Sequence, residues 1–123
     1  MKLTNAEEQV MEIIWRGETV FLKDIMGHYP DPKPATTTVA TLLKRMQEKG
    51  AVAYRLFGNS RQYYSLIPKE EYFERRVYEI VKNFFGDSAF KFASFFTTAS
   101  NFSEKELEEL KKIVEQELNR RKK

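Results

Sequence analysis

The sequence contains no cysteine among its 123 residues, and this absence excludes several kinds of chemistry at once. Disulfides, thiolate metal sites, thiol nucleophiles and cysteine redox sensing all require a sulfhydryl group. Histidine occurs once, at His28, with no cluster of metal ligands near it in sequence. A phosphate-binding glycine loop, a Ser-His-Asp set and paired carboxylates in an apolar setting are also missing. We therefore expect a protein that is not an enzyme and that has neither a cofactor nor a metal site.

Long apolar runs are missing as well. No stretch approaches the roughly 20 residues that a membrane-spanning helix needs. The N-terminal segment MKLTNAEEQVMEIIW has no uninterrupted apolar core of the kind found in signal peptides. We therefore expect a cytoplasmic protein that has no contact with lipid. The hydrophobic content of 41% is nevertheless sufficient for a folded core in one domain, or in a small domain with an appended element.

Negative charge is scarce in one part of the chain. Residues 33–64 contain six basic side chains and one acidic side chain, Glu48, so this segment carries +5 while the whole chain carries +3. The remainder of the chain is therefore net acidic. Positive charge that is concentrated in one segment indicates an anionic partner better than a small overall excess does.

Helical periodicity dominates the first 50 residues. Thr4 and Glu7 have the spacing of a capping box, which predicts a first helix that ends at Gly17. A short second helix is expected over 22–28, before two prolines force a turn. A third helix is predicted over 34–50, with one apolar stripe formed by Val39, Leu42, Leu43 and Met46.

After Gly50 the period changes from that of a helix to that of a strand. Residues 51–57 and 61–67 are rich in β-branched and aromatic side chains, and a Gly-Asn-Ser turn separates them. We expect Tyr64 and at least one other tyrosine to pack this hairpin on the first helix. Three helices followed by a basic hairpin predict a winged helix-turn-helix, whose last helix can enter the DNA major groove.

The predicted fold class is therefore mostly α (α+β), with a winged-helix DNA-binding domain over 1–68 and a helical dimerisation domain over 69–123. Seven of the ten phenylalanines lie between residues 84 and 102, which is more aromatic surface than two or three short helices can enclose. We expect a second copy of the chain to cover it. The candidate dimerisation residues are Phe84, Phe85, Phe92, Phe95, Phe96, Leu107, Leu110 and Val114.

Small hydroxyl side chains and cations share the face of the third helix opposite its apolar stripe. Threonine allows a helix to approach the floor of a DNA groove, while lysine and arginine contact phosphates and arginine can also pair with guanine. Double-stranded DNA is therefore the expected partner. The candidate DNA-binding residues are Thr37, Thr38, Thr41, Lys44 and Arg45 on this helix, with Arg55 and Arg61 in the hairpin. The alternative is a winged helix that docks a foreign protein through its aromatic arm and does not bind DNA.

Three segments in order carry a family resemblance: LTNAEEQVMEIIW, then TTVATLLKRMQEKGAV, then a hairpin that ends in YYSLI. Together they resemble the penicillinase repressor family, the BlaI and MecI type, with the copper-responsive CopY repressors as relatives. The likeness is strong over 3–67 and weaker in the helical remainder, where it includes the LEELKKI stretch.

The resemblance implies a homodimeric repressor that places one recognition helix in each half-site of a palindromic operator. It also implies control of β-lactam resistance genes and inactivation by cleavage of the arm, triggered by a membrane sensor-protease. Family members are cleaved at an Asn-Phe pair, and Asn101-Phe102 is present here. Alignment on the final helix instead places the cleaved bond near Phe95-Phe96, so both positions stay open. Without cysteine, the metal response of the copper branch is excluded.

Overall fold

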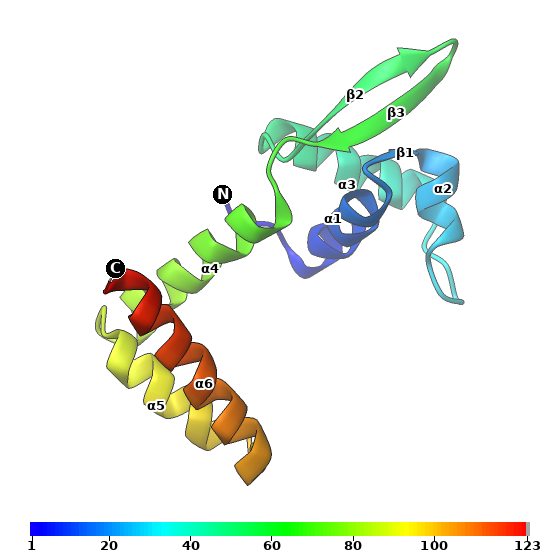
Figure 1. Cartoon of the computed structure of the whole chain (residues 1–123). Helices are drawn as coiled ribbons and strands as arrows, with labels where there is room; N and C mark the ends of the chain where they lie inside the picture. Colours follow the sequence, from blue (N-terminus) through cyan, green and yellow to red (C-terminus); the bar gives the residue numbers. More distant parts are fainter. Residues whose placement is uncertain (123) are drawn as a thin grey trace. The chain divides into compact units, whose positions relative to one another are not determined.

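The computed structural model describes residues 1–122 and contains two compact units (Figure 1). Unit 1 comprises Met1–Arg76, and unit 2 begins at Val77. The division falls inside one helix, α4 (Lys69–Phe84), whose first two turns belong to unit 1.

The helices of unit 1 follow the predicted order. They are α1 (Asn5–Gly17), α2 (Leu22–Gly27) and α3 (Thr36–Glu48). The predicted capping box of α1 is present, because Glu7 N–H donates to Thr4 Oγ1 and Thr4 N–H donates to the Glu7 carboxylate. These two bonds satisfy backbone donors that have no acceptor inside the helix, which fixes where α1 begins.

The strands of unit 1 form one antiparallel sheet in the order β1-β3-β2. β2 (Val52–Phe57) and β3 (Ser60–Ser65) are the predicted hairpin, joined by a turn in which Gly58 has a φ of 61°. A glycine with positive φ at the first turn position suits the right-handed twist of the two strands. The third strand, β1 (Thr19–Phe21), pairs with the Gln62–Tyr64 segment of β3 and was not predicted, since three residues are too few for a periodic signal.

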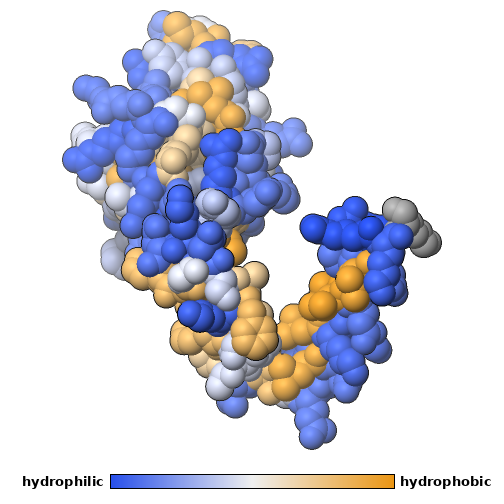
Figure 2. Space-filling model, turned by 90° about the vertical axis from the view of Figure 1, so that its left-hand side faces the viewer, coloured by the Kyte–Doolittle hydropathy of each residue, from blue (hydrophilic) through white to orange (hydrophobic). Residues whose placement is uncertain are grey.

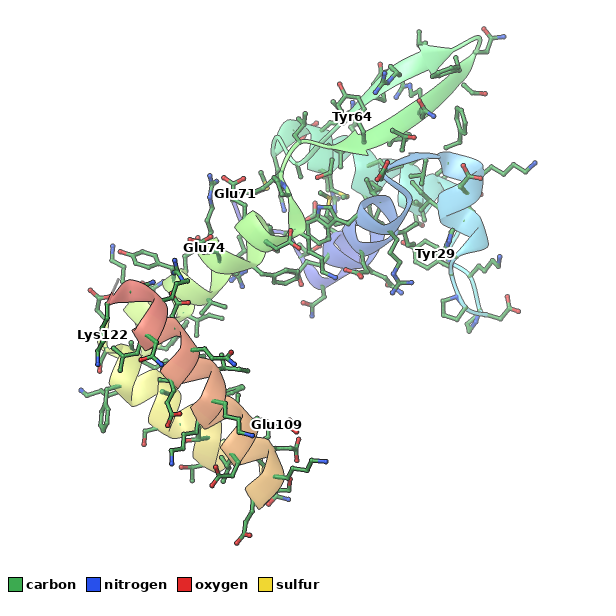
Figure 3. The ribbon with its side chains drawn as sticks, viewed as in Figure 1. Tyr29, Tyr64, Glu71, Glu74, Glu109 and Lys122 are labelled. Carbon is green, nitrogen blue, oxygen red and sulfur yellow. The ribbon has the colours of Figure 1, made fainter. Side chains whose placement is uncertain are left out.

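The core of unit 1 lies between the sheet and the three helices that cover one of its faces (Figure 1). α1 packs against α3 and β3 through Val10, Met11 and Ile14, all of them buried. The prediction for Tyr64 is wrong. Tyr63 points into the core beside Tyr54, whereas Tyr64 is half-buried on the other face of the sheet (Figure 3). Successive strand residues point to opposite faces, so an error of one residue in register moves a side chain out of the core.

α1 ends at Gly17, as the sequence predicts. Gly17 is the last helical residue, but the left-handed residue that follows it is Glu18, with a φ of 64°. Gly17 is instead required by close packing, because a Cβ atom at this position would lie 2.5 Å from Val20 Cγ1. The glycine therefore allows β1 to turn back tightly against α1.

The first two turns of α4 are anchored in unit 1 by aromatic packing and hydrogen bonds. Trp15 lies with its ring 5.7 Å from that of Tyr72, and its indole N–H donates to Ser65 Oγ and to the Ile67 carbonyl. Tyr72 donates from its hydroxyl to Glu8 Oε2 at 2.6 Å. Burial, together with this bond to a carboxylate, raises the pKa of Tyr72 to about 12. These contacts make the start of α4 part of the folded core.

Unit 2 contains the end of α4, then α5 (Ala89–Ala99) and α6 (Glu104–Arg121). Ser103 and Glu106 form a capping box at the start of α6. Phe85 contacts Phe92 and Phe95, and Phe96 contacts Phe102, at ring-centroid distances of 5.3–5.4 Å. Despite these contacts, no side chain between residues 77 and 122 is buried. A mostly helical chain with a winged helix-turn-helix followed by further helices is therefore confirmed.

Candidate nucleic-acid interface

The folding of α3 separates its side chains into a buried stripe and an exposed face. Val39, Leu43 and Met46 are fully buried in the core of unit 1, and Leu42 packs at its edge. Because α3 has 3.6 residues per turn, burying this stripe directs the remaining positions to solvent. The apolar pattern of α3 therefore determines which of its polar side chains a partner can reach.

Every candidate DNA-binding residue on α3 is exposed: Thr37, Thr38, Thr41, Lys44 and Arg45. Thr36 and Ala40 are exposed on this helix as well, and the sequence reasoning did not select them. Thr41 donates from its hydroxyl to the Thr37 carbonyl at 2.9 Å. This bond occupies the hydroxyl proton and leaves the Thr41 methyl group and oxygen lone pairs available to a partner.

Lys44 and Arg45 are exposed cations on this face of α3. In the part of the chain that the structure describes, no carboxylate forms an ion pair with either side chain. Arg16 and Lys69, by contrast, pair with Glu12 elsewhere on unit 1. The exposed face of α3 therefore presents small hydroxyl groups beside two free positive charges, which is the composition that phosphates and base edges require.

Lys49, at the C-terminal end of α3, has a structural role. Its ammonium group donates to the carboxylate of Glu7, which is only 1% exposed, and to the Lys2 carbonyl. Burial alone raises the pKa of Glu7, but the bonds from Lys49 and from Thr4 outweigh it and leave this pKa below its ordinary value. Glu7 therefore stays ionised at neutral pH, and the ion pair joins the end of α3 to the start of α1.

The two hairpin arginines, both exposed, lie on opposite faces of the sheet. Arg55 stacks over the ring of Tyr64, with its guanidinium carbon 5.2 Å from the ring centroid. Arg61 stacks over Tyr54 at 4.3 Å. The register explains the difference, because Leu56 pairs with Arg61 while Arg55 pairs with Gln62. The aromatic rings hold both cations near the hairpin, and both side chains are exposed to an anionic partner.

The candidate dimerisation residues occupy exposed or half-buried positions in unit 2. Phe84, Phe95, Phe96, Leu107 and Val114 are exposed, whereas Phe85, Phe92 and Leu110 are half-buried. In Figure 2, orange apolar side chains form a stripe along one side of the helices of unit 2, next to hydrophilic surface. Phe90, Ile113 and Leu118 add to the exposed apolar surface and were not selected from the sequence.

The two candidate cleavage positions differ in backbone structure. Asn101 is exposed in the turn between α5 and α6, with a φ of 51°, and Phe102 is half-buried beside Phe96. Phe95-Phe96, the other position, lies within α5, where both residues are helical. A helical peptide bond is less accessible to a protease than one in an exposed turn.

Within residues 1–122, no group of three histidine, aspartate or glutamate side chains is arranged to hold a metal ion. No helix in that range is both long enough and apolar enough to span a bilayer.

Comparison with known proteins assigns the chain to a family. The family model for the penicillinase repressor matches residues 3–116, which includes unit 1 and most of unit 2. The chain is also 24% identical, over 122 residues, to the penicillinase repressor of Bacillus licheniformis, covering 98% of this chain and 95% of that protein. The chain therefore belongs to the penicillinase repressor family, which consists of DNA-binding transcriptional repressors and not of enzymes.

Proposed function

We propose that this protein represses transcription as a homodimer on an operator with two inverted half-sites, each read by the α3 helix of one subunit. The observation that carries the proposal is the exposed face of α3. There Lys44 and Arg45, which form no ion pair within residues 1–122, stand beside a row of threonines. A two-fold dimer reads a site with matching two-fold symmetry, so the half-sites lie about one helical turn, or a multiple of it, apart.

The roles of the individual side chains follow from their chemistry. Arg45 forms a bidentate pair with a guanine base, and Lys44 contacts a phosphate. Thr37, Thr38 and Thr41 allow close approach to the groove floor and contact base edges or thymine methyl groups through their hydroxyl and methyl groups. Arg55 and Arg61 neutralise backbone charge next to the site that α3 reads.

Unit 2 supports the homodimer. Its helices bury no side chain between residues 77 and 122, and its exposed apolar surface includes Phe84, Phe95 and Val114. Burying roughly 600 Å² of such surface stabilises a dimer by about 15 kcal/mol before the cost of association is subtracted. A second copy carries the same surface, which makes self-association the simplest way to cover it.

The regulated genes and the inducing signal are proposed from the family. The relative from Bacillus licheniformis is a penicillinase repressor. By analogy, we propose that this chain acts in the cytoplasm and controls β-lactam resistance genes. For inactivation we propose cleavage at Asn101-Phe102, triggered by a membrane sensor-protease. The exposed turn favours this bond over Phe95-Phe96, which lies inside α5. Mass spectrometry of the fragments formed after exposure to a β-lactam identifies the bond.

The test of DNA binding begins with selection of an operator from duplexes that have a randomised centre of about 30 base pairs. Affinity for the selected duplex is then measured by fluorescence anisotropy at several salt concentrations. The logarithm of the binding constant should fall steeply with the logarithm of salt concentration, by about 0.9 for each phosphate neutralised.

Substitution of the two α3 cations separates their roles. Arg45→Ala should cost about 1–3 kcal/mol and relax the preference at one base position. Lys44→Ala should weaken binding equally on all sequences and lower the salt slope by about one. Arg16→Ala, which removes an exposed cation from α1, is the control and should bind like the wild type. Duplex binding that is indifferent to salt and to both α3 substitutions would contradict the proposal and favour a protein-docking role.

A further inference from the structure

α4 is the covalent link between the unit that carries α3 and the unit that carries the proposed dimer contacts. It begins at Lys69 in unit 1 and ends at Phe84 in unit 2, without a break in the helix. Two α3 helices can read two half-sites only if their separation matches that of the half-sites. The direction in which α4 leaves unit 1 therefore bears on the half-site spacing that a dimer accepts.

The start of α4 is attached to the core of unit 1 through one side chain. Of the residues of α4, all of which the structure describes, Tyr72 is the one that is buried. Its hydroxyl group donates to Glu8 Oε2 at 2.6 Å and accepts from the backbone N–H of Leu3 at 3.3 Å. Because the pKa of Tyr72 is raised to about 12 by burial, the hydroxyl keeps its proton and continues to donate at neutral pH. One phenol oxygen thus joins α4 to α1 and to the N-terminal segment.

The other contacts at the start of α4 are less directional. Lys69 Nζ lies 3.0 Å from Glu12 Oε1, but both side chains are partly exposed, and a surface ion pair of this kind contributes little. Phe73 packs with its ring 5.8 Å from that of Trp15 and is 40% exposed. Apolar packing does not select a direction as a hydrogen bond does. The Tyr72 hydroxyl is therefore the contact best suited to fix the angle between α4 and α1.

A small change of angle at Tyr72 becomes a large displacement at the far end of the helix. Phe84 lies twelve residues further along α4, which is roughly 18 Å at the helical rise of about 1.5 Å per residue. A rotation of about 10° at Tyr72 therefore moves that end by roughly 3 Å. Successive base pairs of DNA are about 3.4 Å apart, so the displacement is close to one step of an operator.

We propose that Tyr72 is a positioning residue for operator recognition, because its hydroxyl fixes the direction of α4 and thereby restricts the dimer to a narrow range of half-site spacings. The proposal rests on the proposed function and deepens it, since it names the contact that selects the spacing. Tyr72 is buried and does not contact DNA. It acts on specificity through the separation of the two α3 helices.

The test compares duplexes that differ only in the distance between the half-sites. One base pair is inserted into, or deleted from, the centre of the duplex selected with the full chain, and anisotropy gives the affinity for each. Wild type should bind the altered duplexes about tenfold less tightly than the selected one. Tyr72→Phe keeps the ring but lacks the hydroxyl, so its preference for the selected spacing should fall to about threefold.

Tyr78→Phe is the matched control, because it removes a hydroxyl group from an exposed position of the same helix. It should keep the wild-type spacing preference. Glu8→Ala removes the acceptor of the Tyr72 hydroxyl and should relax the preference as Tyr72→Phe does. The double variant should relax it no further, since both changes break the same bond. Circular dichroism and sedimentation equilibrium check that each variant is folded and dimeric.

Each remaining outcome has a definite meaning. If Tyr72→Phe and Glu8→Ala weaken binding equally at every spacing, Tyr72 has only a structural role, and the proposal is wrong. It is also wrong if both variants keep the wild-type preference, or if wild type binds all spacings alike; the proposed function stands in these cases. If Tyr72→Phe does not fold, Glu8→Ala decides. If wild type binds no duplex in a salt-dependent way, the proposed function and this inference fail together.

Discussion

Unit 1 and unit 2 are both built largely from amphipathic helices, yet only unit 1 encloses a core. All sixteen buried apolar side chains of the described chain, from Leu3 to Tyr72, belong to unit 1. Between residues 77 and 122, large apolar side chains stay in solvent, and Phe90 is 82% exposed. The units differ in what their helices pack against and not in how apolar the helices are, because α5 has a more apolar sequence than α3.

The difference indicates which parts of the chain are self-sufficient. Unit 1 buries its own apolar side chains between its sheet and three helices, and the polar side chains on one face of α3 remain exposed. In unit 2 the apolar stripe has no such cover within residues 77–122, so its stability depends on association. The comparison therefore predicts that dilution destabilises unit 2 and not unit 1, and that polar substitution of exposed positions weakens association only in unit 2.

The largest expected effect comes from polar substitution of the unit 2 stripe. Leu107→Ser/Val114→Ser should weaken dimerisation by about 100-fold or more, because each side chain contributes roughly 1.5–3 kcal/mol when buried. Sedimentation equilibrium measures the loss, and Trp15 fluorescence should show unit 1 unchanged. Lys105→Ser/Lys112→Ser, on the opposite side of α6, is the control. An unaltered dimer would show that the arm associates through a different face.

The next largest effect should appear inside unit 1, at the ion pair between the partly exposed Lys49 and the buried Glu7. Lys49→Met leaves the Glu7 carboxylate buried without its cation and should lower the free energy of unfolding by about 2–3 kcal/mol. Urea denaturation followed by Trp15 fluorescence measures this change. Lys44→Met, on the exposed face of the same helix, should stay within about 0.5 kcal/mol of wild type. A comparable loss of stability in the two variants would contradict the assignment of a structural role to Lys49 and not to Lys44.

A smaller effect is expected where α1 meets β1. Gly17→Ala places a Cβ atom 2.5 Å from Val20 Cγ1 and should destabilise unit 1 by about 1–2 kcal/mol, since overpacking outweighs the gain in helix propensity. Gly27→Ala is the matched control, because a Cβ atom there would have no neighbour within 4 Å. Thermal unfolding distinguishes the variants, and a stabilised Gly17→Ala protein would contradict the packing argument.

The smallest effect concerns acidity and should be confined to unit 1. The folded pKa of Glu7 lies below its unfolded value, so its contribution to stability is complete above the unfolded pKa of about 4.3. It is lost as the pH falls through the lower, folded pKa. Glu7→Gln cannot titrate, so its stability should depend less on pH than that of wild type below about pH 4. Parallel pH profiles would show that Glu7 is not the group responsible.

Sequence patterns were informative where a periodic signal extended over several turns. The stripe Val39, Leu43 and Met46 correctly identified the buried side of α3 and, by subtraction, its exposed side. The capping box at Thr4 correctly located the start of α1. In each case a local pattern determines a local structure, without information from distant residues.

Features that depend on long-range contacts could not be predicted. The pairing of Lys49 with Glu7 joins residues 42 positions apart. The sequence of α3 alone explains only that a cation such as Lys49 is favourable near the C-terminal end of a helix. The choice between Tyr63 and Tyr64 required the register of β3 against β1. The opposite placement of Arg55 and Arg61 depends on the register of β2 against β3, so it became visible only in the structure.

The separation of α3 into a core stripe and a free face has an evolutionary consequence. Thr37, Thr38 and Arg45 make no contribution to the buried core, so selection can exchange them without a loss of fold stability. Duplicated genes can then diverge toward new targets through a few codons while the scaffold is inherited intact. A repressor constructed in this way can acquire a new DNA target without a change of fold.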